Sequence, residues 1–229
     1  MTQMDRRAFL AGLAATPALG LAAAASTPPI HGFLAESGKR GAWPLVIGLL
    51  RTSAPDLHEM QVGLLRRLHN YSRAFRYMST DRNKANFASA LIDFATAPND
   101  LRFIALVVDD PAGRWAELGE GKGAAYAELY RRLIGAVGDE DMVIRPRRRS
   151  DDRRDAALRA YLTNEPGLAV VPADKSNLGE LAAFLAGCIY GEATGVANPM
   201  KRALTERLRQ SIGDPAKFAV SSVTIRSMK

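Results

Sequence analysis

Near the middle of the chain lies Arg102-Phe103-Ile104-Ala105-Leu106-Val107-Val108, an almost continuous run of apolar and β-branched side chains. Such a run predicts a strand over 101–109 that is buried on both faces of a sheet. Pro111 and a glycine-rich turn follow it, and apolar residues at helical spacing then predict a helix over 122–137. A buried strand that leads into a helix indicates an α/β fold.

The segments on either side repeat this alternation. Before the central strand, the sequence predicts a hairpin of strands 31–36 and 43–50 around a turn at 37–41, a helix over 56–69, a short strand over 74–78 and a helix over 81–96. After it, we expect strands over 141–145 and 168–172, helices over 150–162, 176–190 and 199–212, and a closing edge strand over 218–226. These elements predict a three-layer α/β domain with a mixed sheet that opens with an N-terminal hairpin.

The N-terminus has the pattern of a twin-arginine export signal. Adjacent arginines at Arg6 and Arg7 start the pattern, and an uncharged run rich in Ala, Gly and Leu extends over 8–25. Small residues at the end of this run suit cleavage by a signal peptidase before Ser26. We therefore expect 1–25 to be removed as a signal peptide and 26–229 to work as a single domain in the periplasm or outside the cell.

The same run is also open to interpretation as an uncleaved membrane anchor or a buried Ala-rich helix. Pro17 interrupts it, leucines are sparse, and its length is at the short end of what crosses a bilayer. No second long apolar run follows, so we expect no stable membrane span once the signal is removed. Export by the twin-arginine route occurs after folding, which would allow a cofactor to be loaded in the cytoplasm, but nothing in the sequence names one.

Composition supports a folded domain of ordinary size. The chain has a formal net charge of +7 and 47% hydrophobic residues, enough for a real core. Cys188 is the only cysteine and cannot form an internal disulfide. Its small and apolar neighbours predict a buried group on a helix rather than a reactive thiol.

Two motifs carry a resemblance to a known family. Ala35-Glu36-Ser37-Gly38 is followed by a strand, and Ser176-Asn177-Leu178-Gly179-Glu180-Leu181-Ala182-Ala183-Phe184-Leu185-Ala186-Gly187 lies towards the C-terminus. Together they resemble the domain of unknown function 3800 family, over nearly the whole of 26–229. The resemblance implies a ribonuclease H-like fold, with acidic residues on the first strand, a middle strand and the final helix of the motif.

The acidic positions that the resemblance implies are changed in this chain. They fall on Ala35, on Arg145 and on Ala183, which leaves Glu36 as the acidic residue of the first motif. Two Mg²⁺ ions need several converging carboxylates, and neither alanine nor arginine can supply them. We therefore expect no metal and no cofactor, and a non-catalytic binding or scaffold protein with Ser37, Arg145, Ser176 and Glu180 as candidate binding residues.

An active enzyme stays open as the alternative. Asp109 and Asp110 follow the central strand, where open α/β sheets display functional groups, and Asp174 precedes the last motif. With Glu36 they form a relocated carboxylate set, Glu36, Asp109 and Asp174, that would serve a periplasmic Mg²⁺-dependent nuclease or another hydrolase. Turn chemistry is the competing explanation for Asp109-Asp110-Pro111. An exported solute-binding module is a third possibility, for which the chain is short.

Basic residues are concentrated over 145–154. Arg145, Arg147, Arg148, Arg149, Arg153 and Arg154 offer a surface for a polyanion or a protein partner, although interleaved aspartates also fit a solvated helix start. Other catalytic signatures are missing: no serine-hydrolase elbow or nucleotide-binding loop is present. We expect His58 and His69, on one predicted helix, to be surface or helix-end residues.

Overall fold

The computed structural model describes residues 29–38, 43–77, 80–110, 113–117, 122–138, 141–146, 159–160, 162–165, 167–171, 176–211 and 218–224. The predicted signal peptide at 1–25 lies outside these residues. So do Asp174 and, apart from Arg145, all the arginines of the basic cluster.

The elements alternate between strands and helices along the chain. In order they are β1 (Ile30–Ser37), β2 (Leu45–Thr52), α2 (Pro55–Leu68), the 3₁₀ turn η2 (Arg82–Lys84), α3 (Ala85–Thr96), β3 (Arg102–Asp109), α4 (Arg114–Glu117), α5 (Lys122–Gly135), β4 (Met142–Pro146), β5 (Leu168–Val170), α7 (Asn177–Thr194), α8 (Pro199–Ser211) and β6 (Phe218–Thr224). The central strand β3 agrees with the prediction to within one residue.

Six strands form one mixed sheet in the order β5-β4-β1-β2-β3-β6. β1, β2 and β3 form an antiparallel meander, as the short connection between β1 and β2 requires. β4 runs parallel to β1, β5 parallel to β4, and β6 parallel to β3. The chain returns to both sides of the meander through helical crossovers, which are the connections that parallel neighbours need.

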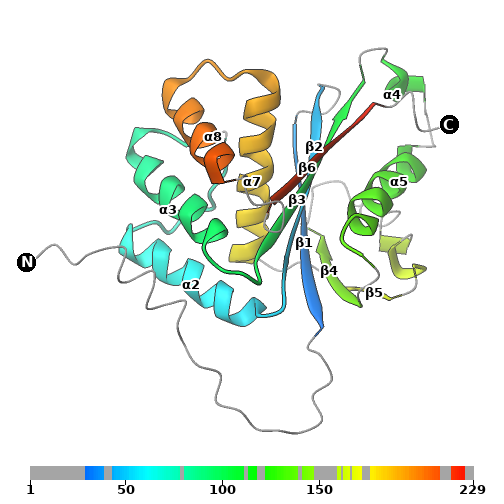
Figure 1. Cartoon of the computed structure of the whole chain (residues 1–229), viewed down its shortest axis with the longest axis horizontal. Helices are drawn as coiled ribbons and strands as arrows, with labels where there is room; N and C mark the ends of the chain where they lie inside the picture. The colour runs from blue at the N-terminus through cyan, green and yellow to red at the C-terminus, as the bar shows by residue number, and fades with distance from the viewer. Residues whose placement is uncertain are drawn as a thin grey trace, which may run out of the picture.

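Helices cover both faces of the sheet, so the domain has three layers (Figure 1). α2, α3, α7 and α8 lie on one face, which we call the α7 side, and α5 with the short α4 lies on the other, the α5 side. Each face buries its own apolar cluster against these helices. The predicted three-layer α/β architecture with an N-terminal hairpin is therefore confirmed.

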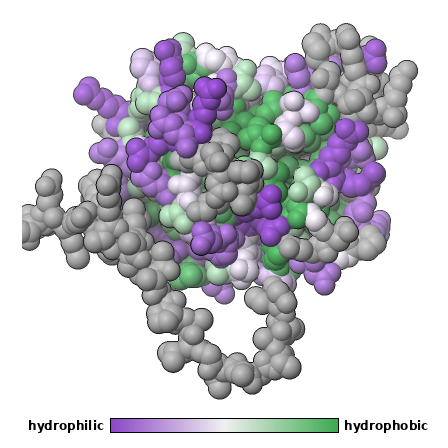
Figure 2. Space-filling view, in the orientation of Figure 1, coloured by the Kyte–Doolittle hydropathy of each residue, from purple (hydrophilic) through white to green (hydrophobic). Residues whose placement is uncertain are grey.

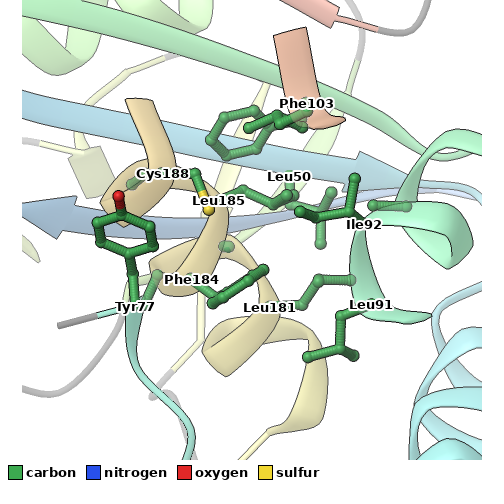
Figure 3. Close-up of a cluster of buried hydrophobic side chains, with 14 of the residues drawn as sticks. Leu50, Tyr77, Leu91, Ile92, Phe103, Leu181, Phe184, Leu185 and Cys188 are labelled. Carbon is green, nitrogen blue, oxygen red and sulfur yellow. The ribbon is translucent and has the colours of Figure 1, made fainter. Parts of the chain in front are cut away.

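α7 is the central helix of the α7 side and packs along β1 and β2. Leu181, Phe184 and Leu185 project from it into the core shown in Figure 3. Its glycines allow close contact with Tyr77: a Cβ at Gly187 would lie 2.5 Å from the Tyr77 Cβ. The small residues of this motif therefore serve packing.

The segment predicted as a strand over 74–78 is not a strand in its described part, 74–77. Phe75 and Tyr77 are buried, and the residue between them, Arg76, is exposed, so the alternation that suggested a strand is present. The segment packs against α7, and within the described part of the chain it pairs with no strand. The predicted helix over 81–96 begins as the 3₁₀ turn η2 and becomes α-helical at Ala85.

The helix predicted over 150–162 falls mainly outside the described residues, which show helical conformation at 159–160 and 162–163. Elsewhere the predicted helices and strands are present, with ends shifted by a few residues. Within the part of the chain that the structure describes, no helix has the length and hydrophobicity needed to span a bilayer.

Candidate functional site

The carboxyl ends of the parallel strands β1 and β4 lie at the same edge of the sheet, and the first motif ends there. Two positions on the α7 side that the resemblance associates with carboxylates carry apolar side chains here. Ala35 of β1 is 2% exposed and Ala183 of α7 is 8% exposed, and both belong to the same buried cluster. The positions that the resemblance associates with two carboxylates therefore form part of the hydrophobic core.

Arg145 brings a positive charge to the α7 side. It pairs with Phe33 of β1, which belongs to the cluster on that side, so its side chain is on the same face of the sheet. Its Nε atom is buried and has no hydrogen-bond partner among the described residues. Burial lowers the pKa of His31 below its ordinary value, and the nearby charge of Arg145 lowers it further.

Glu36 lies on the opposite face of the sheet. Side chains alternate along a strand, so Glu36 follows Ala35 onto the α5 side, where its Oε1 accepts a hydrogen bond from the Tyr130 hydroxyl of α5. One turn earlier on α5, Tyr126 contacts Trp115, with ring centroids 4.7 Å apart. Glu36 is thus joined to an aromatic side chain of the α5 side.

Ser37 ends β1 opposite Val46 and is half-buried. Alternation returns its side chain to the α7 side, the same face as Ala35. It is therefore placed on the opposite face from Glu36, although the two are adjacent in the motif.

Asp109 and Asp110 have different environments. Asp109 is the exposed last residue of β3, and its predecessor Val108 packs on the α5 side, which places Asp109 on the α7 side. Asp110 is buried, and its carboxylate accepts hydrogen bonds from the backbone N–H groups of Arg114 at 2.9 Å and Trp115 at 2.8 Å. Asp110 therefore caps the start of α4, in agreement with turn chemistry.

The structure does not bring Glu36 and Asp109 together. They point to opposite faces of the sheet, and their strands are separated by β2. The third member of the proposed set, Asp174, lies outside the described residues. Among the residues that are described, no group of three or more His, Cys, Asp or Glu side chains has the arrangement of a metal site.

Ser176 is the N-cap of α7. Its Oγ accepts a hydrogen bond from the Gly179 N–H at 3.0 Å and donates one to the Glu59 carboxylate of α2. Glu59 also accepts from the backbone N–H groups of Asn177 at 2.8 Å and Leu178 at 3.0 Å. A carboxylate is favoured at a helix N-terminus, so an internal side chain already fills the anion-binding position of α7.

Glu180 joins α7 to two other segments. Its Oε2 accepts one hydrogen bond from Nη2 of Arg66 on α2. It accepts a second one, at 3.2 Å, from the backbone N–H of Phe75. The Arg66 guanidinium also lies over the Phe75 ring, 5.1 Å from its centroid. The side chains of Arg66 and Glu180 are 15% and 18% exposed, so this ion pair is largely buried. Both Ser176 and Glu180 therefore have internal structural contacts.

A buried polar network at the opposite edge of the sheet was missed by the sequence reasoning. His58 is 2% exposed, which corrects the prediction of a surface residue, and its Nε2 lies 3.0 Å from the Asp100 Oδ2. Its Nδ1 lies 2.8 Å from the Gln61 Oε1, and the Thr52 hydroxyl donates to Asp100 at 3.0 Å. No local signal links His58 with Asp100, since they are 42 positions apart. His69 is the C-cap of α2, as predicted for a helix-end residue.

Cys188 is fully buried in α7, and burial raises its pKa well above the ordinary value. A thiol that stays protonated is a poor nucleophile, in agreement with the prediction of a packing role. A small opening lies elsewhere on the α7 side, and neither Ala35 nor Ala183 lines it. Its lining residues are Tyr71, Phe75, Thr80, Lys84, Phe87, Ala88, Leu91 and Phe184.

No protein-family model matches the chain, and no curated protein matches it. Two solved structures show a distant likeness. A chain in the structure of the PCNA:RNase HII complex from Archaeoglobus fulgidus is 17% identical, with a TM-score of 0.42, and the match covers 83% of this chain and 93% of that one. Ribonuclease H2 from Pyrococcus horikoshii OT3 is 16% identical, with a TM-score of 0.38, covering 79% and 99%.

Similarity at this level says nothing about the chemistry of this chain. The mixed sheet with its N-terminal hairpin and helices on both faces is consistent with the ribonuclease H-like fold that the motifs predicted.

Proposed function

We propose that the protein is an exported domain with a ribonuclease H-like architecture that binds or supports a partner and has no metal-dependent catalysis. One observation carries this proposal. Ala35 and Ala183 are buried in one apolar cluster, at the positions where the resemblance places metal-binding carboxylates.

The environment of this edge is unsuited to a divalent cation. Mg²⁺ requires a nearly octahedral set of oxygen ligands and gives up its water reluctantly, so an apolar surface does not hold it. The guanidinium of Arg145 lies on the same face and repels a cation, most strongly where water is excluded. Glu36 is turned away and bonded to Tyr130. Its carboxylate is engaged in joining β1 to α5.

The alternative of an active hydrolase draws no support from the described residues. Glu36 and Asp109 face opposite sides of the sheet, and Asp110 has its carboxylate occupied by the backbone of α4. The basic cluster over 145–154 remains our proposed contact for a polyanion or a protein partner, because clustered guanidinium groups favour negatively charged surfaces.

The catalytic part of the proposal is tested by metal titration together with a cleavage assay. We expect calorimetry of the purified protein with MgCl₂ or MnCl₂ to show no tight binding, and RNA, DNA and RNA–DNA hybrids to remain intact. Glu36→Gln should behave like the unaltered chain in both assays, as should Glu206→Gln on α8. Tight binding of two metal ions, or metal-dependent cleavage that Glu36→Gln removes while Glu206→Gln does not, would contradict the proposal.

The export part of the proposal is tested by changing the paired arginines. The twin-arginine route reads these residues as an address, so Arg6→Lys/Arg7→Lys is expected to leave the protein in the cytoplasm of a bacterium that has this route. Cell fractionation and immunoblotting give the readout. Arg202→Lys/Arg209→Lys on α8 makes the same chemical change on the domain surface and should be exported normally. If the protein with lysines at positions 6 and 7 still reached the periplasm in full, the predicted address would be wrong.

A further inference from the structure

α2 carries a row of apolar side chains that the domain does not cover. Leu57 is 38% exposed, Met60 is 56% exposed and Leu68 is 61% exposed. Leu64, half-buried, lies between them along the helix. Spacings of three and four residues place all four side chains on one face of α2. The other side of the helix packs in the core, so α2 is apolar on two sides, one of which faces solvent.

Charges border this row at both ends of the helix. Asp56 is in the first turn of α2 and Arg67 is in the last turn, and both are exposed. They are eleven positions apart, which is close to three helical turns, so they lie along the same flank of the row. Each charge interacts favourably with the helix dipole at its own end, so both would also stabilise α2 in a monomer.

The side chains on this face of α2 would match those of a second copy of α2 that runs in the opposite direction. If two copies of the helix are laid antiparallel, Leu57 of one meets Leu68 of the other, and Met60 meets Leu64. On the flank, Asp56 of each copy lies beside Arg67 of the other. A two-fold axis near Val62 brings each of these pairs to within about one residue of register, or about 1.5 Å along the helix, as an isologous interface requires.

We propose that the exposed face of α2 binds α2 of a second copy of this chain in an antiparallel, two-fold symmetric dimer. Figure 1 places α2 at the outer edge of the helical layer. The charge complementarity selects a second copy over an unrelated apolar partner. The inference does not depend on whether the domain binds metal.

The contact area indicates a weak dimer. A helix of 14 residues is about 21 Å long. Such a helix pair alone buries less surface than a standard stable interface, so we expect dissociation in the micromolar range. A dimer of this kind forms and separates with protein concentration.

The first experiment measures the mass of the purified full chain by sedimentation equilibrium over a micromolar to submillimolar series. We expect a reversible equilibrium between monomer and dimer. Leu68→Glu introduces charges into the apolar row of both copies and should weaken the dimer by about 100-fold. Circular dichroism should show that the altered chain is still folded, because Leu68 is on the surface.

A charge-exchange experiment identifies the occupant as a second copy in this orientation. Asp56→Arg places arginine beside Arg67 of the other copy, and Arg67→Asp places aspartate beside Asp56, so each variant alone should dimerise about tenfold more weakly. An equimolar mixture of the two variants restores both opposite-charge pairs. The mixture should therefore form a heterodimer with nearly the original affinity. Glu206→Arg on α8 makes the same charge change as Asp56→Arg and should leave dimerisation unchanged.

Three outcomes would overturn the proposal. The full chain could remain monomeric at every concentration, as it would if a different protein or the N-terminal segment of the same chain covers α2. A dimer that tolerates Leu68→Glu uses another surface. A mixture of Asp56→Arg and Arg67→Asp that associates no better than either variant alone excludes the antiparallel arrangement.

Discussion

Phe184→Ala is expected to lower the free energy of unfolding by about 3–5 kcal/mol, the usual range for removing a buried phenylalanine ring. Phe184 is 1% exposed and projects from α7 into the core of Figure 3. Its ring is 5.7 Å from that of Phe75 and 6.5 Å from that of Tyr77. Removing it takes a buried ring out of the packing between α7 and the segment that follows α2, next to the opening that Phe75 and Phe184 line.

Denaturant unfolding of the purified protein measures this effect. Phe184→Leu serves as the control, because it keeps most of the volume and should cost less than about 1.5 kcal/mol. A loss of under about 1 kcal/mol for Phe184→Ala would mean that the neighbouring side chains fill the space, and that the described packing of α7 is wrong.

Glu180→Ala is expected to lower the free energy of unfolding by about 2–4 kcal/mol. This is close to the range for removing one partner of a buried ion pair. The substitution leaves the Arg66 guanidinium without its carboxylate and removes the acceptor of the Phe75 N–H. We place the value slightly below the range for fully buried pairs because both side chains keep some contact with water.

The exposed pair of Asp93 and Arg207 provides a matched control for this prediction. Two hydrogen bonds of 2.7 Å join them, but their side chains are 37% and 48% exposed. Asp93→Ala should therefore cost less than about 1 kcal/mol. If Glu180 were held for a ligand instead of for the fold, Glu180→Ala would cost no more than Asp93→Ala, and the structural role assigned here would be refuted.

The central strand could be predicted from the sequence because its information is local. An unbroken run of β-branched and apolar residues over 103–108 has no helical period, and few alternatives to a buried strand exist for it. The segment over 74–78 shows the limit of the same reasoning. Phe75 and Tyr77 alternate inward as they would in a strand, but a strand also needs a neighbour. Here the Phe75 N–H is bonded to Glu180 instead, which lies 105 residues away.

The candidate site was predictable in its positions and not in its contacts. The motif places Glu36 on the first strand, and the structure agrees. Which face Glu36 occupies depends on the packing of α5, whose Tyr130 is 94 positions further along the chain. The same holds for Ser176, since its role as a cap follows from local pattern but its bond to Glu59 spans 117 positions. A local sequence pattern contains the polar residue but not its distant hydrogen-bond partner. Such a residue is therefore predicted to be functional when its role is structural.

The position of α7 in the chain has a consequence for synthesis on the ribosome. β1 and β2 emerge first, yet the helix that covers them is translated only after residue 176, and the outer strand β6 follows later still. A nascent chain stopped before that point exposes one whole face of its hairpin to water. Contacts between segments so far apart in the sequence slow folding, so the interior of the domain is complete only after α7 and β6 have been translated.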